Sequence, residues 1–157
     1  MKKKEYVPYL LIVIFVILLR TFIITPVIVN GPSMRPTLEN GEVLILKKYD
    51  TKIARFEIVV IKYNNDKLVK RVIGLPGETI KYEDNKLYVN NKLIEETFIH
   101  GSTMNFETTV PKGAYFVLGD NRTNSTDSRS IGPVYKKSII GTTNLSIFPF
   151  NKIGIIK

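Results

Sequence analysis

Apolar and polar residues divide this chain into one long apolar stretch and a succession of short β-type segments. Residues 7–29 are almost unbroken in apolar character, and Arg20 is the only charged residue among them. As a helix this stretch would be about 34 Å long, which is enough to cross the roughly 30 Å hydrocarbon core of a bilayer. The pattern predicts a transmembrane anchor over residues 7–29, with residues 1–6 before it and one further domain, residues 30–157, after it.

The charges around the apolar stretch predict its orientation. Residues 2–4 are three lysines, and no basic residue occurs between Arg20 and Arg35. By the positive-inside rule, residues 1–6 lie in the cytoplasm and residues 30–157 lie outside it, as in a single-pass protein of the plasma membrane. A cleavable signal peptide is the competing interpretation. No small-x-small cleavage site follows the apolar core, so an uncleaved anchor is favoured.

Beyond residue 41 the pattern becomes that of strands. Short runs rich in apolar and β-branched residues, bounded by turn residues, occur at 43–46, 56–63, 67–75, 79–82, 86–89, 92–94, 115–118, 141–148 and 153–156. Asn90-Asn91 between two of these runs predicts a hairpin, and no long segment after residue 30 repeats its apolar residues every 3.6 positions. The sequence predicts a mainly β fold, an antiparallel sheet or partly closed barrel behind one N-terminal transmembrane helix.

Composition narrows the classes of function. The 23 basic and 14 acidic residues give a net charge of +9. The basic residues do not cluster beyond three in a row and do not alternate with aromatic residues, which disfavours nucleic-acid binding. Cysteine is absent and His100 is the only histidine. We therefore expect no disulfide, no thiol nucleophile, no thiolate or multi-histidine metal site and no histidine-based triad, with His100 left as a candidate only for a lone base.

The first candidate for chemistry is Ser33, in the segment 31–38 that reads Gly-Pro-Ser-Met-Arg-Pro-Thr-Leu. Pro32 and Pro36 each lack an N–H, fix their own φ and disfavour helix at the residue before them. Ser33 is therefore expected in a defined loop just outside the membrane. A plain polar turn after the anchor is the alternative interpretation.

The second candidate is Lys70, in the β-type run at 67–75. Side chains alternate between the two faces of a strand, so Lys70 shares a face with Leu68 and Val72, and apolar residues occupy both faces. Burial between such neighbours lowers the pKa of an ammonium group, and a neutral lysine is a usable general base. The alternative is an ordinary lysine that extends to solvent at the edge of a strand.

The third candidate is the loop at residues 119–133, which is dense in side chains that form hydrogen bonds. Ser125 is suited to bind an amine, and Asp127 and Arg129 are suited to form a bidentate ion pair that fixes the loop. A solvated surface loop has a similar composition.

Three motifs in this order resemble those of the bacterial type I signal peptidases, which use a serine–lysine dyad. They are the segment 31–38, the segment 70–78 (Lys-Arg-Val-Ile-Gly-Leu-Pro-Gly-Glu), and Gly119-Asp120-Asn121 through 124–129 to Gly132. The resemblance implies a β catalytic domain on a membrane anchor, with a second lobe reduced to about residues 79–110. It also implies removal of signal peptides from exported preproteins after small residues (Ala-x-Ala type), through an acyl-enzyme and without a cofactor.

The resemblance also implies roles for individual residues. Ser33 matches the nucleophile, Lys70 the general base, and Ser125 the serine that orients the lysine amine. The remaining matches are to supporting residues, namely the ion pair of Asp127 and Arg129, and Asp120 with its partner Arg71. The family's eukaryotic relatives have histidine at the base position, where this chain has Lys70.

Gly31 departs from the pattern, because some relatives have there a serine whose hydroxyl helps bind the oxyanion. In this chain the backbone N–H of Ser33 would bind it, with the Gly31 amide or a water as a second donor. The Phe148-Pro149-Phe150 segment is either a core element or a contact with the membrane interface.

Other classes of function remain open at this point. A related serine–lysine protease of the conjugation or self-cleaving repressor type would have the same dyad, and the anchor and the third motif argue against a repressor. An inactive membrane-anchored binding homologue would retain the fold without the chemistry, although Ser33 and Lys70 are intact. A mitochondrial homologue would differ only in location.

Overall fold

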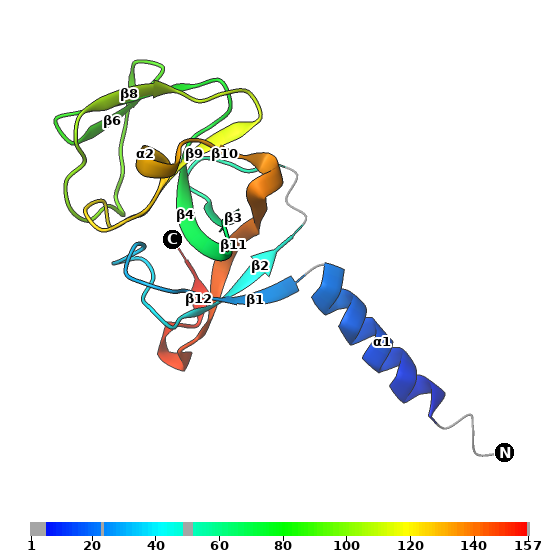
Figure 1. The fold of residues 1–157 in the computed structure, drawn as a ribbon. Coiled ribbons are helices and arrows are strands. Elements are labelled where there is room, and N and C mark those ends of the chain that lie inside the picture. The colour runs from blue at the N-terminus through cyan, green and yellow to red at the C-terminus, as the bar shows by residue number, and fades with distance from the viewer. Residues whose placement is uncertain (1–5, 23, 49–51, 157) are drawn as a thin grey trace.

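The computed structural model describes residues 6–22, 24–48 and 52–156, which form one N-terminal helix and two antiparallel β-sheets (Figure 1). The helices are α1 (Val7–Phe22), α2 (Ser128–Ile131), η1 (Lys136–Ser138) and η2 (Phe150–Lys152). The strands are β1 (Ile24–Ile28), β2 (Val43–Lys47), β3 (Ile58–Tyr63), β4 (Asp66–Gly74), β5 (Thr79–Glu83), β6 (Lys86–Val89), β7 (Lys92–Ile94), β8 (Phe106–Thr109), β9 (Ala114–Leu118), β10 (Val134–Tyr135), β11 (Ile139–Phe148) and β12 (Gly154–Ile155).

The larger sheet has eight strands in the order β1-β2-β11-β3-β4-β9-β10, with β12 paired to β11. This confirms the prediction of a mainly β, antiparallel fold. Of the two predicted forms, a sheet or a partly closed barrel, the structure has no closed barrel, because β1 and β10 at the two ends of the order each pair with a single strand among the described residues. The sheet is therefore open.

The apolar stretch at residues 7–29 does not form the single helix that was predicted. Helix α1 ends at Phe22, and residues 24–28 form β1, which pairs with β2. The reason is local: β-branched residues dominate this segment, and Pro26 cannot donate a helical hydrogen bond but is tolerated in an edge strand. Within the described residues no helix is both long and apolar enough to cross a membrane, and α1 has 16 residues.

A smaller sheet, in the order β7-β6-β5-β8, comprises residues 79–109 and lies at the end of the β domain remote from α1 (Figure 1). The predicted hairpin at Asn90-Asn91 is confirmed, with both residues at positive φ, as a type I′ turn requires. Strand β8 was not predicted, because residues 95–110 are mixed and polar. The small sheet buries Ile80, Tyr82 and Leu87 against Phe116 of the larger sheet.

Strand β4 is the central element of the fold. It pairs with β3 over residues 66–71 and with β9 over residues 71–74. Residues 69–74 are all buried, so both faces of this half of the strand are covered, as the sequence predicts. The N-terminal half of β4 therefore keeps one unpaired edge on the side of β9.

Candidate active site

The loop that contains Ser33 is anchored to the core on both sides of the serine. Met34 and Leu38 are fully buried in one apolar cluster with Val27 and Val29. Two turns fix the backbone, through Arg35 N–H to the Pro32 carbonyl (3.1 Å) and Leu38 N–H to the Met34 carbonyl (2.9 Å). Ser33 itself is partly buried, so its hydroxyl is held at the rim of the core.

Lys70 reaches this hydroxyl from the middle of β4. Its Nζ donates to Ser33 Oγ at 2.8 Å and to the carbonyl of Val69 at 2.9 Å, and the residue is 2% exposed. The structure thus brings together two residues that are 37 positions apart, and Lys70 does not extend to solvent. Burial lowers the pKa of the Lys70 ammonium to about 8, and the nearby carboxylates of Asp127 and Asp120 oppose this shift.

The carboxylate of Asp120 lies in a buried ion pair with Arg71, the neighbour of Lys70. Arg71 Nε and Nη2 donate to the two oxygens of Asp120 at 2.9 and 2.6 Å, with side chains 4% and 0% exposed. Thr37 Oγ1 also donates to Asp120, at 2.5 Å, and the Phe98 ring lies 4.0 Å from the Arg71 guanidinium carbon. This cluster ties the nucleophile loop to β4 and to the segment after β9. Sequence reasoning missed Thr37 and Phe98.

Asp127 and Arg129 form the bidentate ion pair that their types and spacing suggest. Arg129 Nε and Nη2 donate to Asp127 at 2.8 and 2.7 Å. Asp127 is completely buried, accepts from Gly119 N–H at 3.1 Å, and caps helix α2 by accepting from Arg129 N–H. The Asp127 carboxylate therefore accepts hydrogen bonds from the backbone just after β9, from the first turn of α2 and from the Arg129 guanidinium.

Ser125 lies close to the nucleophile loop through Gly119. A side chain at Gly119 would clash with Ser125 Oγ and with the Ser33 carbonyl oxygen. Ser125 Oγ is buried and has no hydrogen-bond partner, so it does not bind the Lys70 amine in this structure. A buried hydroxyl without a partner is unusual in a folded protein and marks a group with free hydrogen-bonding capacity near the nucleophile loop.

Asn121 is a further residue of the site that sequence reasoning missed. Its backbone N–H donates to the Ser33 carbonyl at 3.0 Å, and its side-chain amide donates to the Pro32 carbonyl at 3.3 Å. These contacts fix the peptide groups on both sides of the nucleophile. Asn121 belongs to the motif Gly119-Asp120-Asn121, but only the fold shows that it contacts the nucleophile loop.

The hypothesis that the Gly31 amide helps to bind an oxyanion does not hold in this structure. Gly31 N–H already donates to the side-chain oxygen of Asn40 at 2.8 Å. Gly31 also has φ of +88°, a conformation that glycine adopts readily and serine does not. Among the described residues no group accepts from Ser33 N–H, which leaves that amide available as an oxyanion donor.

A groove of about 780 Å³ lies between the segments that precede Ser33 and Lys70 in the chain. One wall consists of Pro26, Val27, Ile28, Asn30 and Gly31, and the other of Asn65, Asp66, Lys67 and Leu68. The walls end two residues before Ser33 and Lys70, respectively. They come from β1 and from the N-terminal half of β4, each of which has one unpaired edge among the described strands. The groove therefore lies between two strand segments that each have a free edge.

The site is suited to base-assisted nucleophilic attack. It combines a hydroxyl, a desolvated amine in contact with it, a free backbone donor and a groove with unpaired strand edges. Within residues 6–22, 24–48 and 52–156 no group of three or more metal-ligating side chains occurs.

Comparisons with known proteins agree with this chemistry. The model of the family described as "Signal peptidase, peptidase S26" matches residues 3–148. A signal peptidase I of Bacillus amyloliquefaciens is 39% identical over 157 residues, which cover 90% of this chain and 85% of the relative. Signal peptidase I V of Bacillus subtilis (strain 168) is 47% identical over 133 residues, covering 72% of this chain and 79% of the relative.

A solved structure is similar as well. The crystal structure of a signal peptidase I from Enterococcus faecalis V583 has 38% sequence identity and a TM-score of 0.55. The match covers 59% of this chain and 97% of that one.

Proposed function

Because this chain belongs to the signal peptidase family, peptidase S26, and is a serine peptidase, we propose that it removes signal peptides from exported preproteins with Ser33 as nucleophile and Lys70 as general base. The observation that carries the proposal is the 2.8 Å contact between Lys70 Nζ and Ser33 Oγ, made by an amine that is almost completely buried. Family membership supports the substrate class, and the contact supports the assignment of the two residues.

The reaction begins with the neutral form of Lys70. The amine accepts the hydroxyl proton of Ser33 while Oγ attacks the scissile carbonyl carbon, and the Ser33 N–H stabilises the negative oxygen that forms. The resulting ammonium donates its proton to the departing amine, and the signal peptide remains esterified to Ser33. Lys70 then accepts a proton from a water molecule whose oxygen attacks the ester carbon. The Lys70 ammonium returns this proton to Ser33 Oγ as the ester bond breaks, which restores the neutral amine and the hydroxyl. Because only the neutral amine can begin the cycle, the competent fraction of the enzyme increases as the pH rises through about 8.

The supporting residues hold this pair in place. Arg71 and Arg129 neutralise Asp120 and Asp127, the two carboxylates that raise the pKa of Lys70. Ser125 is proposed to orient the amine when a substrate excludes water, which would give its unpaired hydroxyl a partner. The second oxyanion donor is not Gly31 N–H, which is occupied by Asn40.

The groove is proposed to bind the residues before the cleavage site as an extended strand. Unpaired edges of β1 and β4 form its two walls, so a strand between them would gain main-chain hydrogen bonds on both sides. Side chains alternate in a strand, so the first and third residues before the cut face the same way. This agrees with the expected Ala-x-Ala specificity, in which these two residues are small.

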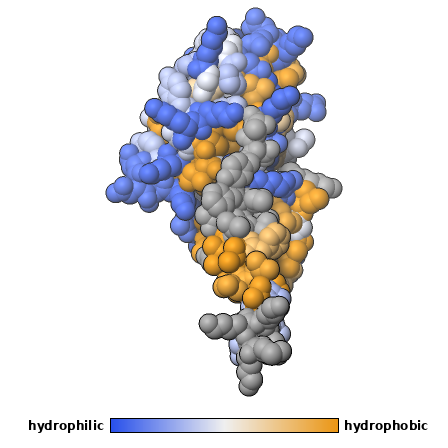
Figure 2. Space-filling view, turned by 90° about the vertical axis from the view of Figure 1, so that its right-hand side faces the viewer, coloured by the Kyte–Doolittle hydropathy of each residue, from blue (hydrophilic) through white to orange (hydrophobic). Residues whose placement is uncertain are grey.

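Helix α1 is proposed to anchor the chain in a lipid bilayer, with residues 1–6 in the cytoplasm and the β domain on the extracytoplasmic side. Its aliphatic side chains from Val7 to Ile17 are 44–60% exposed, apart from Pro8, and Figure 2 shows hydrophobic surface at the end of the molecule from which α1 extends. Its 16 residues rise about 24 Å, a length that a bilayer accommodates by local thinning.

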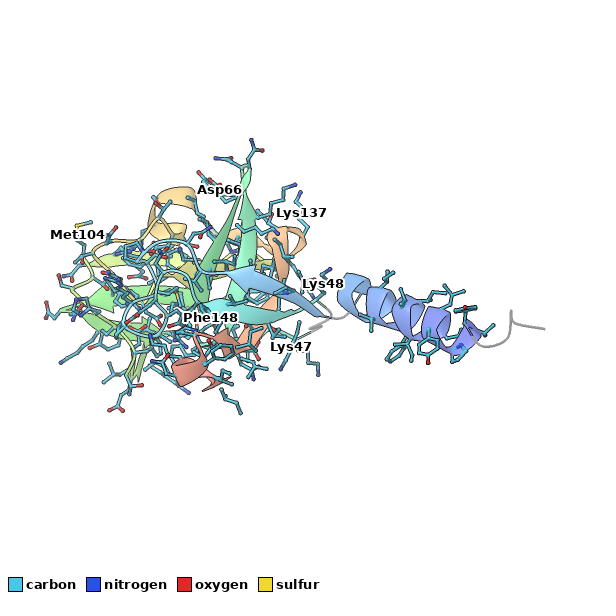
Figure 3. The ribbon with its side chains drawn as sticks, turned by 90° about the horizontal axis from the view of Figure 1, so that it is seen from below. Lys47, Lys48, Asp66, Met104, Lys137 and Phe148 are labelled. Atoms are coloured by element: carbon cyan, nitrogen blue, oxygen red, sulfur yellow. The ribbon has the colours of Figure 1, made fainter. Side chains whose placement is uncertain are left out.

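Other surface residues are placed consistently with this anchoring. Figure 3 shows Lys47 and Lys48 on the side of the β domain from which α1 extends. Phe148 and Phe150 are 46% and 81% exposed, which favours the interfacial interpretation of this segment over a core role.

Substituting Lys70→Met tests the dyad. We expect kcat for cleavage of a preprotein to fall about 10³-fold, to the level of Ser33→Ala, because the methionine keeps the length of the side chain without the base. Lys62→Met, at an exposed position of the neighbouring strand β3 and outside the groove, is the matched control and should retain wild-type kcat. Cleavage by Lys70→Met at the wild-type rate would refute the dyad.

A preprotein series tests the groove. Replacing the alanine immediately before the cut, or the third residue before it, by phenylalanine should lower kcat/KM by about 10²-fold, because the bulky side chain meets the wall of the groove. The same replacement at the second position, which faces the other way, should change kcat/KM less than threefold. Equal losses at all three positions would argue against an extended strand.

Protease added to sealed, right-side-out membranes tests the anchor. We expect the β domain to be digested while a fragment containing α1 stays with the membrane through an alkaline wash. Release of the intact chain by the wash, or complete protection of the β domain, would contradict this topology.

A further inference from the structure

The small sheet is connected to the nucleophile loop by a buried polar network centred on Arg122. The Arg122 side chain is completely buried and is paired with Glu96, whose side chain is 3% exposed, at 2.5 Å. Arg122 Nη1 donates to Tyr82 OH at 2.8 Å and to Thr103 Oγ1 at 3.2 Å, and Tyr82 OH donates to Glu96 at 2.8 Å. Tyr82 belongs to β5, and Glu96 and Thr103 belong to the connection between β7 and β8.

The same arginine holds the chain beside the nucleophile. Arg122 Nε donates to the Gly119 carbonyl at 3.0 Å. Gly119 is the point where the strand end touches the nucleophile loop, since any side chain there would clash with the Ser33 carbonyl oxygen. The guanidinium therefore links Glu96 of the small-sheet region with the backbone against which Ser33 packs.

A backbone contact runs parallel to this link. His100 N–H donates to the Asp120 carbonyl at 2.7 Å, and Arg122 N–H donates to the His100 carbonyl at 2.8 Å. Because backbone groups alternate in direction along an extended chain, the intervening Asn121 N–H faces the opposite way, toward the Ser33 carbonyl. Residues 120–122 are thus a short extended segment with the small-sheet region on one side and the nucleophile on the other.

We propose that Glu96 and Tyr82 are positioning residues, which act through Arg122 to hold residues 119–122 against Ser33. The inference rests on the proposed function for the identity of the nucleophile, but it concerns residues to which the dyad chemistry assigns no role. In this proposal the small sheet contributes to the reaction by fixing the backbone of residues 119–122, on which the distance between Ser33 Oγ and Lys70 Nζ depends. Displacement of a reacting group by about 1 Å can cost on the order of 10²-fold in rate.

Glu96→Gln and Tyr82→Phe test the proposal in the full chain. Glu96→Gln keeps the shape but turns an amide toward the donors of Arg122, and Tyr82→Phe removes only the hydroxyl that bridges Arg122 and Glu96. Val89→Ala, in the same small-sheet core but outside the network, is the control for a simple loss of stability.

Two measurements are made on each variant well below its Tm. Hydrogen exchange of residues 119–123 should accelerate at least tenfold in both network variants and stay unchanged in Val89→Ala. For preprotein cleavage, kcat should fall about 10–100-fold in Glu96→Gln and about 3–10-fold in Tyr82→Phe, with KM within twofold of wild type, while Val89→Ala retains both constants.

Wild-type exchange of residues 119–123 in Glu96→Gln would overturn the inference whether or not the chain cleaves preproteins. Equal effects of Val89→Ala on exchange and kcat would also overturn it, because the network would then contribute stability alone. If the network variants show faster exchange but the wild-type chain cleaves no preprotein, the proposed function fails and the positioning of this loop stands.

Discussion

The site depends on the burial of the Lys70 amine, close to two carboxylates that are each already paired with an arginine. Lys70 lies in the half of β4 that is covered on both faces, and this burial is the largest influence on its pKa. Asp120 and Asp127 oppose it, since carboxylates near an ammonium favour the charged form. Each carboxylate is in turn bound bidentately by an arginine, Arg71 or Arg129. The pKa near 8 is the balance of these effects, and it leaves a usable fraction of neutral amine near neutral pH.

The same buried groups assemble the site from distant parts of the chain. Asp120 joins Thr37 of the nucleophile loop to Arg71 of β4, while Asp127 joins the end of β9 to the start of α2. A buried charge that loses its partner is strongly destabilising, so these contacts tolerate few arrangements. Buried ion pairs and hydrogen bonds surround Ser33 and Lys70, whereas the groove retains two unpaired strand edges.

The sequence predicts the β class, the hairpin at Asn90-Asn91 and the burial of β4, because each follows from local periodicity or turn chemistry. The motifs also contain two of the pairs that meet at the site, Ser33 with Lys70 and Asp120 with Arg71. Local patterns fail where tertiary pairing decides the structure. Residues 24–28 are apolar enough for a helix but pair with β2, and β8 is formed from residues whose own pattern is mixed. Three contacts depend on tertiary packing and cannot be predicted from the spacing of residues in the sequence. They are Gly31 N–H with Asn40, Arg122 with Glu96, and Asn121 with Ser33.

Direct titration of the Lys70 amine is the most decisive measurement. With lysine labelled by ¹³C at Cε, the chemical shift of each Cε reports the protonation of its own amine, and Lys70→Met identifies the signal of Lys70. The account predicts that this signal titrates near pH 8, well below the ordinary lysine value of about 10.4. A Lys70 signal that titrates at the ordinary value would show that the amine is not desolvated, and would contradict its assignment as the general base.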